Sequence, residues 1–131
     1  MRSLVAEDDP TCRETLVKLL ERHGPVSTVA DGAAAVKAVA DSLANGEPFD
    51  LVCLDILMPV LDGRQALAAI RKIEAEHGIA GLACVKIIMT TVLSDKNSIF
   101  DAFRRQCEAY IVKPVSRDKL DRELRNLGLP A

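Results

Sequence analysis

The chain has 131 residues, of which 49% are hydrophobic and 27% are charged, and its formal net charge at pH 7 is −2. A chain of this length forms about one domain and buries enough surface to fold without a disulfide or metal. Aromatic residues make up 3% and tryptophan is absent, which argues against nucleic-acid recognition by base stacking. The balance of 17 basic and 19 acidic residues also excludes strong, charge-driven binding to a phosphate backbone.

The N-terminal sequence and the cysteines point to a reducing compartment. Acidic residues interrupt the first segment before a signal-type apolar region can develop, and no apolar run reaches the ~18 residues of a membrane span. No two cysteines have a CxxC spacing, and each lies in an apolar stretch that suits a free thiol. We therefore expect a cytoplasmic protein with no membrane partner; the four cysteines are Cys12, Cys53, Cys84 and Cys107.

Short apolar runs alternate with longer segments of helical spacing along the whole chain. The elements predicted in chain order are strand Leu4–Ala6, helix Pro10–His23, strand Val26–Ala30, helix Gly32–Leu43, strand Leu51–Leu54, helix Gly63–Glu76, strand Cys84–Met89, helix Asp95–Gln106, strand Ala109–Val112 and helix Arg117–Leu127. Asp9 is a good N-cap for the first helix and Gly24 a good stop signal. Five strands and five helices in strict alternation predict a doubly wound α/β fold with a parallel sheet covered on both faces. Because no linker or repeat interrupts the pattern, residues 1–131 are expected to form a single domain.

Polar side chains follow four of the predicted strands. Glu7 and Asp8 follow the first strand, Asp55 the third, Thr90 the fourth and Lys113 the fifth. In an open parallel sheet, ligands bind beyond the carboxyl ends of the strands, so these groups are expected to meet there. Three clustered carboxylates repel one another unless a cation is present, and Mg²⁺ fits best because it binds few carboxylates and keeps positions for phosphate oxygens.

An aspartate beside Mg²⁺, a lysine and a threonine is a credible acceptor for a phosphoryl group. Taken singly, each residue has a simpler explanation: Asp9 as a helix cap, Thr90 as a strand end and Lys113 as a solvated side chain. Their coincidence at four strand ends favours the chemical explanation.

The motifs around these residues carry a family resemblance. They are LVAEDDP with Glu7 and Asp8, DILMPVLDG with Asp55, IIMTT with Thr90, and YIVKP with Tyr110 and Lys113. With them, the chain resembles a response-regulator receiver domain of two-component phosphorelay signalling over essentially its full length. The resemblance implies a flavodoxin-like, CheY-like parallel sheet of order 2-1-3-4-5.

The resemblance also implies the roles of the site residues. Asp55 would accept a phosphoryl group from a phosphohistidine on a sensor histidine kinase or a histidine phosphotransfer protein. Lys113 would contact that group. The Mg²⁺ ligands would be Asp8, Asp55 and the backbone carbonyl of Leu57, with Glu7 binding directly or through water.

By the same resemblance, phosphorylation would move Thr90 toward the phosphoryl group and swing Tyr110 inward behind it. This would alter the face formed by the fourth helix, the fifth strand and the fifth helix, through which an unknown protein target would bind. The resemblance implies a signalling domain, not an enzyme beyond its self-catalysed phosphorylation and dephosphorylation. It implies a monomer or phosphorylation-dependent dimer, no direct nucleic-acid partner, and a cis bond between Lys113 and Pro114.

The chain departs from the common receiver pattern at five positions. Thr91 replaces a frequent alanine, and Gln106 and Cys107 replace a frequent Gly-Ala pair before Tyr110, which bears on the packing behind the fifth strand. Leu57 and Val92 lie two residues after the acceptor and the switch threonine, where fast-dephosphorylating receivers often carry polar groups. Because neither side chain can orient a water molecule, we expect slow self-dephosphorylation.

Other functions remain open. The length leaves no room for an output domain, so a free-standing receiver is expected, acting either on a target or as a relay intermediate or phosphate sink. A Mg²⁺-dependent phosphatase with an aspartyl-phosphate intermediate usually carries a second acid two residues after the nucleophile, where this chain has Leu57. A nucleotide- or flavin-binding domain is expected to have a glycine-rich loop after the first strand, where this chain has three acids. A degenerate receiver that works without phosphate is disfavoured because every expected site residue is present.

Overall fold

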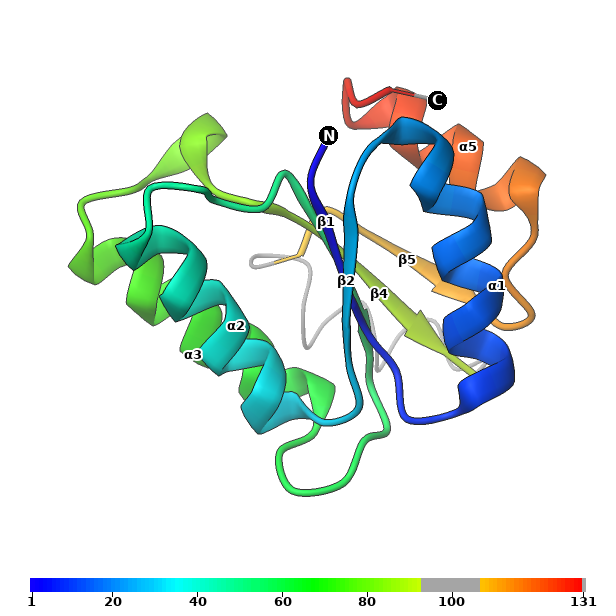
Figure 1. Ribbon diagram of the computed structural model, residues 1–131, viewed down its shortest axis with the longest axis horizontal. Coiled ribbons are helices and arrows are strands. Elements are labelled where there is room, and N and C mark those ends of the chain that lie inside the picture. The colour runs from blue at the N-terminus through cyan, green and yellow to red at the C-terminus, as the bar shows by residue number, and fades with distance from the viewer. Residues whose placement is uncertain (93–106, 131) are drawn as a thin grey trace.

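The structure is a computed structural model that describes residues 1–92 and 107–130. Its centre is a five-stranded parallel sheet of order β2-β1-β3-β4-β5 (Figure 1). The strands are β1 (Ser3–Ala6), β2 (Val26–Val29), β3 (Leu51–Asp55), β4 (Lys86–Thr91) and β5 (Ala109–Val112). The predicted fold class and strand order are therefore confirmed.

Helices cover both faces of this sheet, as Figure 1 shows, with α2 and α3 on one side and α1 and α5 on the other. The α-helices of the described residues are α1 (Pro10–Leu20), α2 (Gly32–Ala44), α3 (Gly63–Glu76) and α5 (Arg117–Asn126). Two short 3₁₀ turns, η1 (Glu21–His23) and η2 (Gly81–Ala83), follow α1 and precede β4. The predicted helix Asp95–Gln106 lies outside the described residues.

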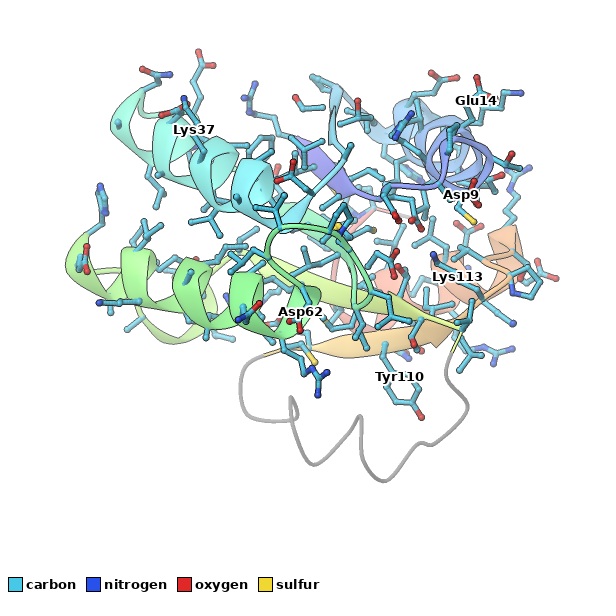
Figure 2. The ribbon with its side chains drawn as sticks, turned by 90° about the horizontal axis from the view of Figure 1, so that it is seen from below. Asp9, Glu14, Lys37, Asp62, Tyr110 and Lys113 are labelled. Atoms are coloured by element: carbon cyan, nitrogen blue, oxygen red, sulfur yellow. The ribbon has the colours of Figure 1, made fainter. Side chains whose placement is uncertain are left out.

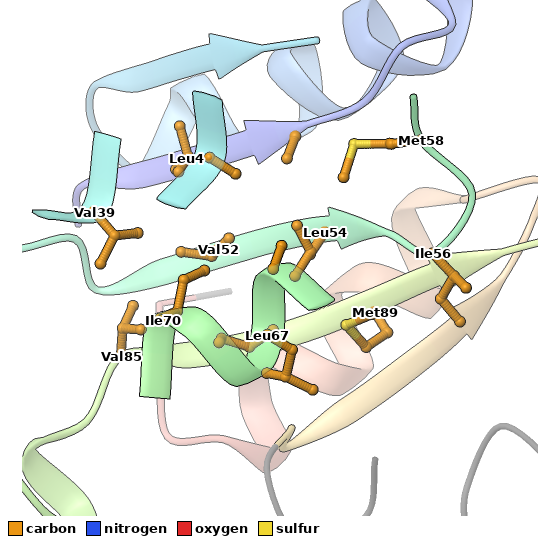
Figure 3. Close-up of a cluster of buried hydrophobic side chains, with 14 residues drawn as sticks. Leu4, Val39, Val52, Leu54, Ile56, Met58, Leu67, Ile70, Val85 and Met89 are labelled. Carbon is orange, nitrogen blue, oxygen red and sulfur yellow. The ribbon is translucent and has the colours of Figure 1, made fainter. Parts of the chain in front are cut away.

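The alternation of side chains along each strand builds two separate hydrophobic cores. The core under α2 and α3 (Figure 3) contains Leu4, Ala6, Val39, Val52, Leu54, Leu67, Ile70, Ile87 and Met89. The core under α1 and α5 contains Val5, Leu16, Leu20, Cys53, Ile88, Ile111, Leu120 and Leu124. Because β1, β3 and most of β4 are buried on both faces, the middle of each strand is apolar and the polar residues lie at the strand ends.

The predicted position of the fourth strand is wrong by two residues. The sequence predicts Cys84–Met89, whereas β4 runs from Lys86 to Thr91. The backbone N–H of Val85 donates to the Glu74 carboxylate at 2.7 Å, so this residue bonds to α3 instead of the sheet. The strand extends to Thr91 because the Thr91 carbonyl accepts from the Lys113 backbone N–H at 2.6 Å.

The first helix also ends earlier than predicted. Its α-helical part stops at Leu20, and Glu21–His23 tighten into η1 before Gly24. Its start agrees with the prediction, because the Asp9 side chain accepts from the Thr11 backbone N–H at 3.2 Å and so caps the helix. Within residues 1–92 and 107–130, the remaining predicted boundaries agree within one residue at each end.

An ion network that the sequence did not predict joins α3 to the amino ends of β4 and β5. Glu74 is 3% exposed and pairs with Arg71 at 2.8 Å. The Arg71 guanidinium also donates to both carboxylate oxygens of Glu108 at 3.0 Å, and Glu108 accepts from the Ile87 backbone N–H at 2.6 Å. Such charge-assisted, bidentate bonds fix the two strand ends against one helix.

The start of α3 lies against the end of β3. Asp62 and Gln65 form a reciprocal capping box, with the Gln65 backbone N–H donating to Asp62 at 3.0 Å. Gly63 then passes so close to β3 that a Cβ atom there would lie 2.4 Å from the Asp55 carbonyl oxygen. Glycine is therefore required at this contact, which sets the path of the loop between β3 and α3.

Two further properties concern the chain as a whole. Within residues 1–92 and 107–130, none of the helices combines the length and apolarity that crossing a bilayer requires. All four cysteines are free thiols, as predicted, although only Cys53 is fully buried.

The Gly63 contact can be tested by Gly63→Ala. The added methyl group would overlap the Asp55 carbonyl, so we expect the free energy of unfolding to fall by about 2 kcal/mol. Gly46→Asn is the matched control, because Gly46 has open space around it and asparagine tolerates its positive φ. Denaturant unfolding should show no more than about 0.5 kcal/mol of change for the control. Equal losses in both variants would contradict the steric explanation.

Candidate functional site

The carboxyl ends of β1, β3 and β5 bring three acids and one lysine together. Carboxylate oxygens of Glu7, Asp8 and Asp55 all lie within 4.8 Å of one another. The Lys113 ammonium lies 2.5 Å from Glu7 Oε1 and 3.3 Å from Asp55 Oδ2. Figure 2 shows Lys113 at this edge, near the end of β5. The sequence predicted this grouping from the strand ends alone.

The strand register places each of these groups. Ala6 pairs with Leu54 across β1 and β3, so Glu7, directly after β1, lies level with Asp55, the last residue of β3. Asp55 pairs with Thr90 across β3 and β4, and the Ile56 backbone N–H donates to the Thr90 carbonyl at 3.0 Å. These bonds hold the site on rigid strand ends, with the loops beyond it.

Glu7 is fully buried, and its charge is supported by several groups. Burial raises the pKa of the Glu7 carboxyl, but hydrogen bonds from Asp55 and Lys113 and from the Asp9 backbone N–H outweigh burial. The net result is a pKa below the ordinary value. The Asp9 backbone N–H donates to Glu7 Oε2 at 3.2 Å. An Arg13 guanidinium nitrogen donates to the backbone carbonyl of Glu7 at 3.0 Å, so this bond holds the main chain and not the carboxylate.

Asp55 shifts in the opposite direction. Burial, together with the hydrogen bond to Glu7 and the negative charge of Glu7, raises the pKa of the Asp55 carboxyl to about 7, and Lys113 offsets only part of this. For Lys113, burial acts to lower the pKa, but the bond to Glu7 and the charge of Asp55 outweigh burial and raise it. In the absence of a cation, the two buried carboxyls therefore share one ammonium and, near neutral pH, part of one proton.

The donor set fits a hard divalent cation such as Mg²⁺. Glu7 and Asp55 are buried, Asp8 is exposed, and all their ligand atoms are carboxylate oxygens. The backbone N–H of Leu57 donates to Asp55 Oδ1 at 3.3 Å, which holds the start of the following loop against the site. Burial and the neighbouring Glu7 raise the pKa of Asp55, and a bound cation would favour its charged form.

The remaining predicted residues occupy different surroundings. Thr90 is buried, and its hydroxyl oxygen has no hydrogen-bond partner within the part of the chain that the structure describes. Tyr110 is half-buried on β5, packs against the core under α2 and α3, and points away from Lys113 in Figure 2. The peptide bond between Lys113 and Pro114 is cis, as the resemblance implied.

Two supporting groups were missed by the sequence reasoning. The Asp9 backbone N–H and the Arg13 side chain both bind Glu7, but the sequence indicated only a capping role for Asp9. Arg13 lies one turn into α1, so its spacing from Glu7 could have suggested the contact. The Asp9 amide gave no sequence signal, because any residue supplies a backbone N–H.

Comparisons with known proteins agree with this geometry. Residues 4–125 match the family model of the response regulator receiver domain. The chain is 37% identical over 120 residues to the sensor protein GacS of Pseudomonas syringae pv. syringae, covering 91% of this chain and 12% of GacS. It is 29% identical to the chemotaxis protein CheY of Listeria monocytogenes, covering 92% of each protein. The chain thus spans about an eighth of the sensor protein but nearly all of the chemotaxis protein.

Solved structures extend the comparison to the fold. The receiver domain of the sensor histidine kinase PA1611 from Pseudomonas aeruginosa, with a magnesium ion coordinated in its active site cleft, is 27% identical with a TM-score of 0.75, over 97% of each chain. The receiver domain of the histidine kinase CKI1 from Arabidopsis thaliana is 24% identical with a TM-score of 0.82, over 97% of this chain and 89% of that one. The matched family model, the relatives and the shared sheet order lead to one conclusion: the chain belongs to the response regulator receiver domain family.

Proposed function

We propose that this receiver domain, spanning residues 1–131, accepts a phosphoryl group on Asp55 in a Mg²⁺-dependent reaction. The observation that carries the proposal is the buried Asp55 carboxyl, held between Glu7 and the Lys113 ammonium, with Asp8 completing an all-oxygen set of acids. Asp55 would be the nucleophile, because it lies on the central strand β3, paired with Thr90 and in contact with Lys113, the two residues that would bind the product. As a receiver, the chain serves signalling and is not a classical enzyme.

In the proposed reaction, the donor is a phosphohistidine on a sensor histidine kinase or histidine phosphotransfer protein. An Asp55 oxygen attacks phosphorus as the phosphorus–nitrogen bond breaks, and the departing imidazole keeps the electron pair and takes a proton from solvent. Mg²⁺, held by Glu7, Asp8, Asp55 and the Leu57 backbone carbonyl, would neutralise charge on the transferring group.

Lys113 and Thr90 would bind the product. Lys113 already contacts both buried acids, so a small displacement of its ammonium would let it pair with a phosphoryl oxygen. The buried Thr90 hydroxyl would donate to another phosphoryl oxygen. The added charge would thereby bias the position of Thr90 and, through β4 and β5, that of Tyr110.

The proposed output is a change in the surface near β5 and α5. A hollow of about 360 Å³ there is lined by Tyr110, Lys119, Arg122 and Glu123, so a shift of Tyr110 would reshape it for a protein target. Onward transfer in a relay, or storage of phosphate as a sink, would use the same Asp55 chemistry. Phosphohistidine donors obtain their phosphoryl group from ATP, so we propose that the transfer to Asp55 takes place in the cytoplasm.

Labelling with acetyl phosphate and Mg²⁺ tests the acceptor. Intact mass measurement should show an adduct of roughly 80 Da, one phosphoryl group, in the wild type and none in Asp55→Asn. Asp41→Asn is the control, because Asp41 is an exposed acid paired with Lys37 on α2. Labelling that persists in Asp55→Asn would place the acceptor elsewhere. Continuous turnover of a phosphomonoester would instead indicate a phosphatase.

The raised pKa of Asp55 predicts a pH-dependent stability without Mg²⁺. The folded state holds the Asp55 proton up to about pH 7, whereas the unfolded carboxyl releases it near its ordinary value of 3.8, so stability falls as pH rises between these values. Asp55→Asn removes this loss. In EDTA we expect the variant to exceed the wild type by about 2 kcal/mol at pH 8 and much less at pH 4, measured by denaturant unfolding. Lower stability of the variant at pH 8 would contradict the assignment.

Leu57 and Val92 predict a long-lived phosphoryl group. Both side chains are apolar and at least half exposed, so neither can orient a water molecule for attack. The double variant Leu57→Asn, Val92→Glu should shorten the lifetime of the phosphorylated protein at least about tenfold. Loss of label is followed by mass after removal of the donor, with Leu82→Asn as the control. An unchanged lifetime would show that these side chains do not control hydrolysis.

A further inference from the structure

The start of α2 lies directly against the loop that follows β3. Gly32 is the first residue of α2, and a Cβ atom there would lie 1.8 Å from the Leu61 carbonyl oxygen and 2.7 Å from the Leu61 carbonyl carbon. Figure 1 shows the start of α2 meeting the loop between β3 and α3 at the lower edge of the view. Gly32 has no positive φ, so its backbone conformation suits any residue. Glycine is therefore required at this position for space alone.

The segment that Gly32 contacts, residues 56–62, is here called the β3–α3 loop, and its base is fixed. Ile56 is buried, and its backbone N–H donates to a carbonyl of β4 at 3.0 Å. The Gly63 backbone N–H donates to the Ile56 carbonyl at 2.8 Å, which closes the loop. Because the base is held in this way, a displacement of Leu61 must be taken up between Leu57 and Leu61.

The β3–α3 loop is also stiff next to Leu61. The ring of Pro59 restricts its own φ, and the Leu61 backbone N–H donates to the Pro59 carbonyl at 2.8 Å. This bond closes a γ-turn around Val60, whose φ is 70°. A shift of the stiff turn therefore passes to the peptide unit between Leu57 and Met58. The oxygen of that peptide unit is the Leu57 carbonyl oxygen, the backbone ligand proposed above for Mg²⁺.

Of the two elements in contact, α2 is the firmer one. Its Ala35 and Val39 are buried in the core under α2 and α3, and Figure 3 shows Val39 within that core. The outer side of the β3–α3 loop faces water instead, since Leu57 is 50% and Val60 81% exposed. A close-packed core resists displacement more than an exposed turn does. An atom added at Gly32 is therefore expected to move the loop and not the helix.

We propose that Gly32 is a positioning residue for the Mg²⁺ site: by leaving room for Leu61, it sets the position of the Leu57 carbonyl. This inference rests on the proposed function, in which the Leu57 carbonyl binds the cation. Mg²⁺ demands a nearly octahedral set of oxygens at about 2.1 Å, whereas Ca²⁺ accepts irregular sets of roughly six to eight oxygens. A displaced carbonyl should therefore weaken the binding of Mg²⁺ more than that of Ca²⁺.

Gly32→Ala tests this role through cation binding, without any phosphoryl donor. Amide NMR titrations of the full chain, at a temperature where the variants stay folded, should show the Kd for Mg²⁺ raised about tenfold and the Kd for Ca²⁺ raised at most about threefold. Gly24→Ala is the matched control, because a Cβ atom there would lie 2.1 Å from the Met1 carbonyl oxygen, at the opposite end of the sheet. The control should lose stability in denaturant as Gly32→Ala does, but keep both wild-type Kd values.

A second variant covers the case in which Gly32→Ala does not fold. Asp31→Ala removes the cap bond from the Ala34 backbone N–H to Asp31, 2.8 Å long, and so loosens the first turn of α2 without adding an atom. The Kd for Mg²⁺ should rise about threefold and that for Ca²⁺ should stay unchanged.

The outcomes separate positioning from general damage. An unchanged Kd for Mg²⁺ in the folded α2 variant would overturn the proposal, because the contact would then be structural only. Equal weakening in Gly32→Ala and Gly24→Ala, or equal weakening of Mg²⁺ and Ca²⁺, would also overturn it. If the wild type bound no Mg²⁺ at all, the proposed function itself would fail.

Discussion

The structure depends on the burial of two carboxylates beside one ammonium. Glu7 and Asp55 are almost fully removed from solvent, and Lys113 contacts both. A buried charge is tolerated only when partners lie within hydrogen-bonding distance. These three residues come from different strands, so β1, β3 and β5 must run parallel and end at the same level for the charges to meet. The register of β1, β3 and β4 places Glu7, Asp55 and Thr90 at this edge.

The charge at this edge is only partly balanced by the chain itself. Hydrogen bonds from Asp55, Lys113 and the Asp9 amide outweigh burial and hold the pKa of Glu7 below its ordinary value, whereas burial and the neighbouring Glu7 raise the pKa of Asp55 to about 7. The remaining imbalance is concentrated on the one carboxyl whose nucleophilic use is proposed. Hydrophobic packing on both faces fixes the strands, so the imbalance cannot be relieved by local rearrangement of the backbone. The excess of negative charge therefore stays at this edge of the sheet.

Much of the fold and the grouping at the site could be predicted, because both follow from short-range patterns. Gly63–Glu76 and Ala109–Val112 have the predicted boundaries, and the strand-end acids meet because parallel strands share their carboxyl edge. Features set by contacts distant in sequence could not be predicted. The start of β4 depends on the bond from Val85 to Glu74, and the loop after β3 depends on the approach of Gly63 to that strand. The roles of the site residues remain proposals.

The ion network at the opposite end of the sheet has a mechanical consequence. Arg71 binds Glu74 within α3 and Glu108 next to β5, while Glu74 and Glu108 accept from backbone amides at the start of β4. The amino ends of β4 and β5 are thereby anchored to one helix. The two strands are therefore held at both ends. At their carboxyl ends, the Lys113 amide donates to the Thr91 carbonyl, and the Lys113 ammonium contacts Glu7 and Asp55.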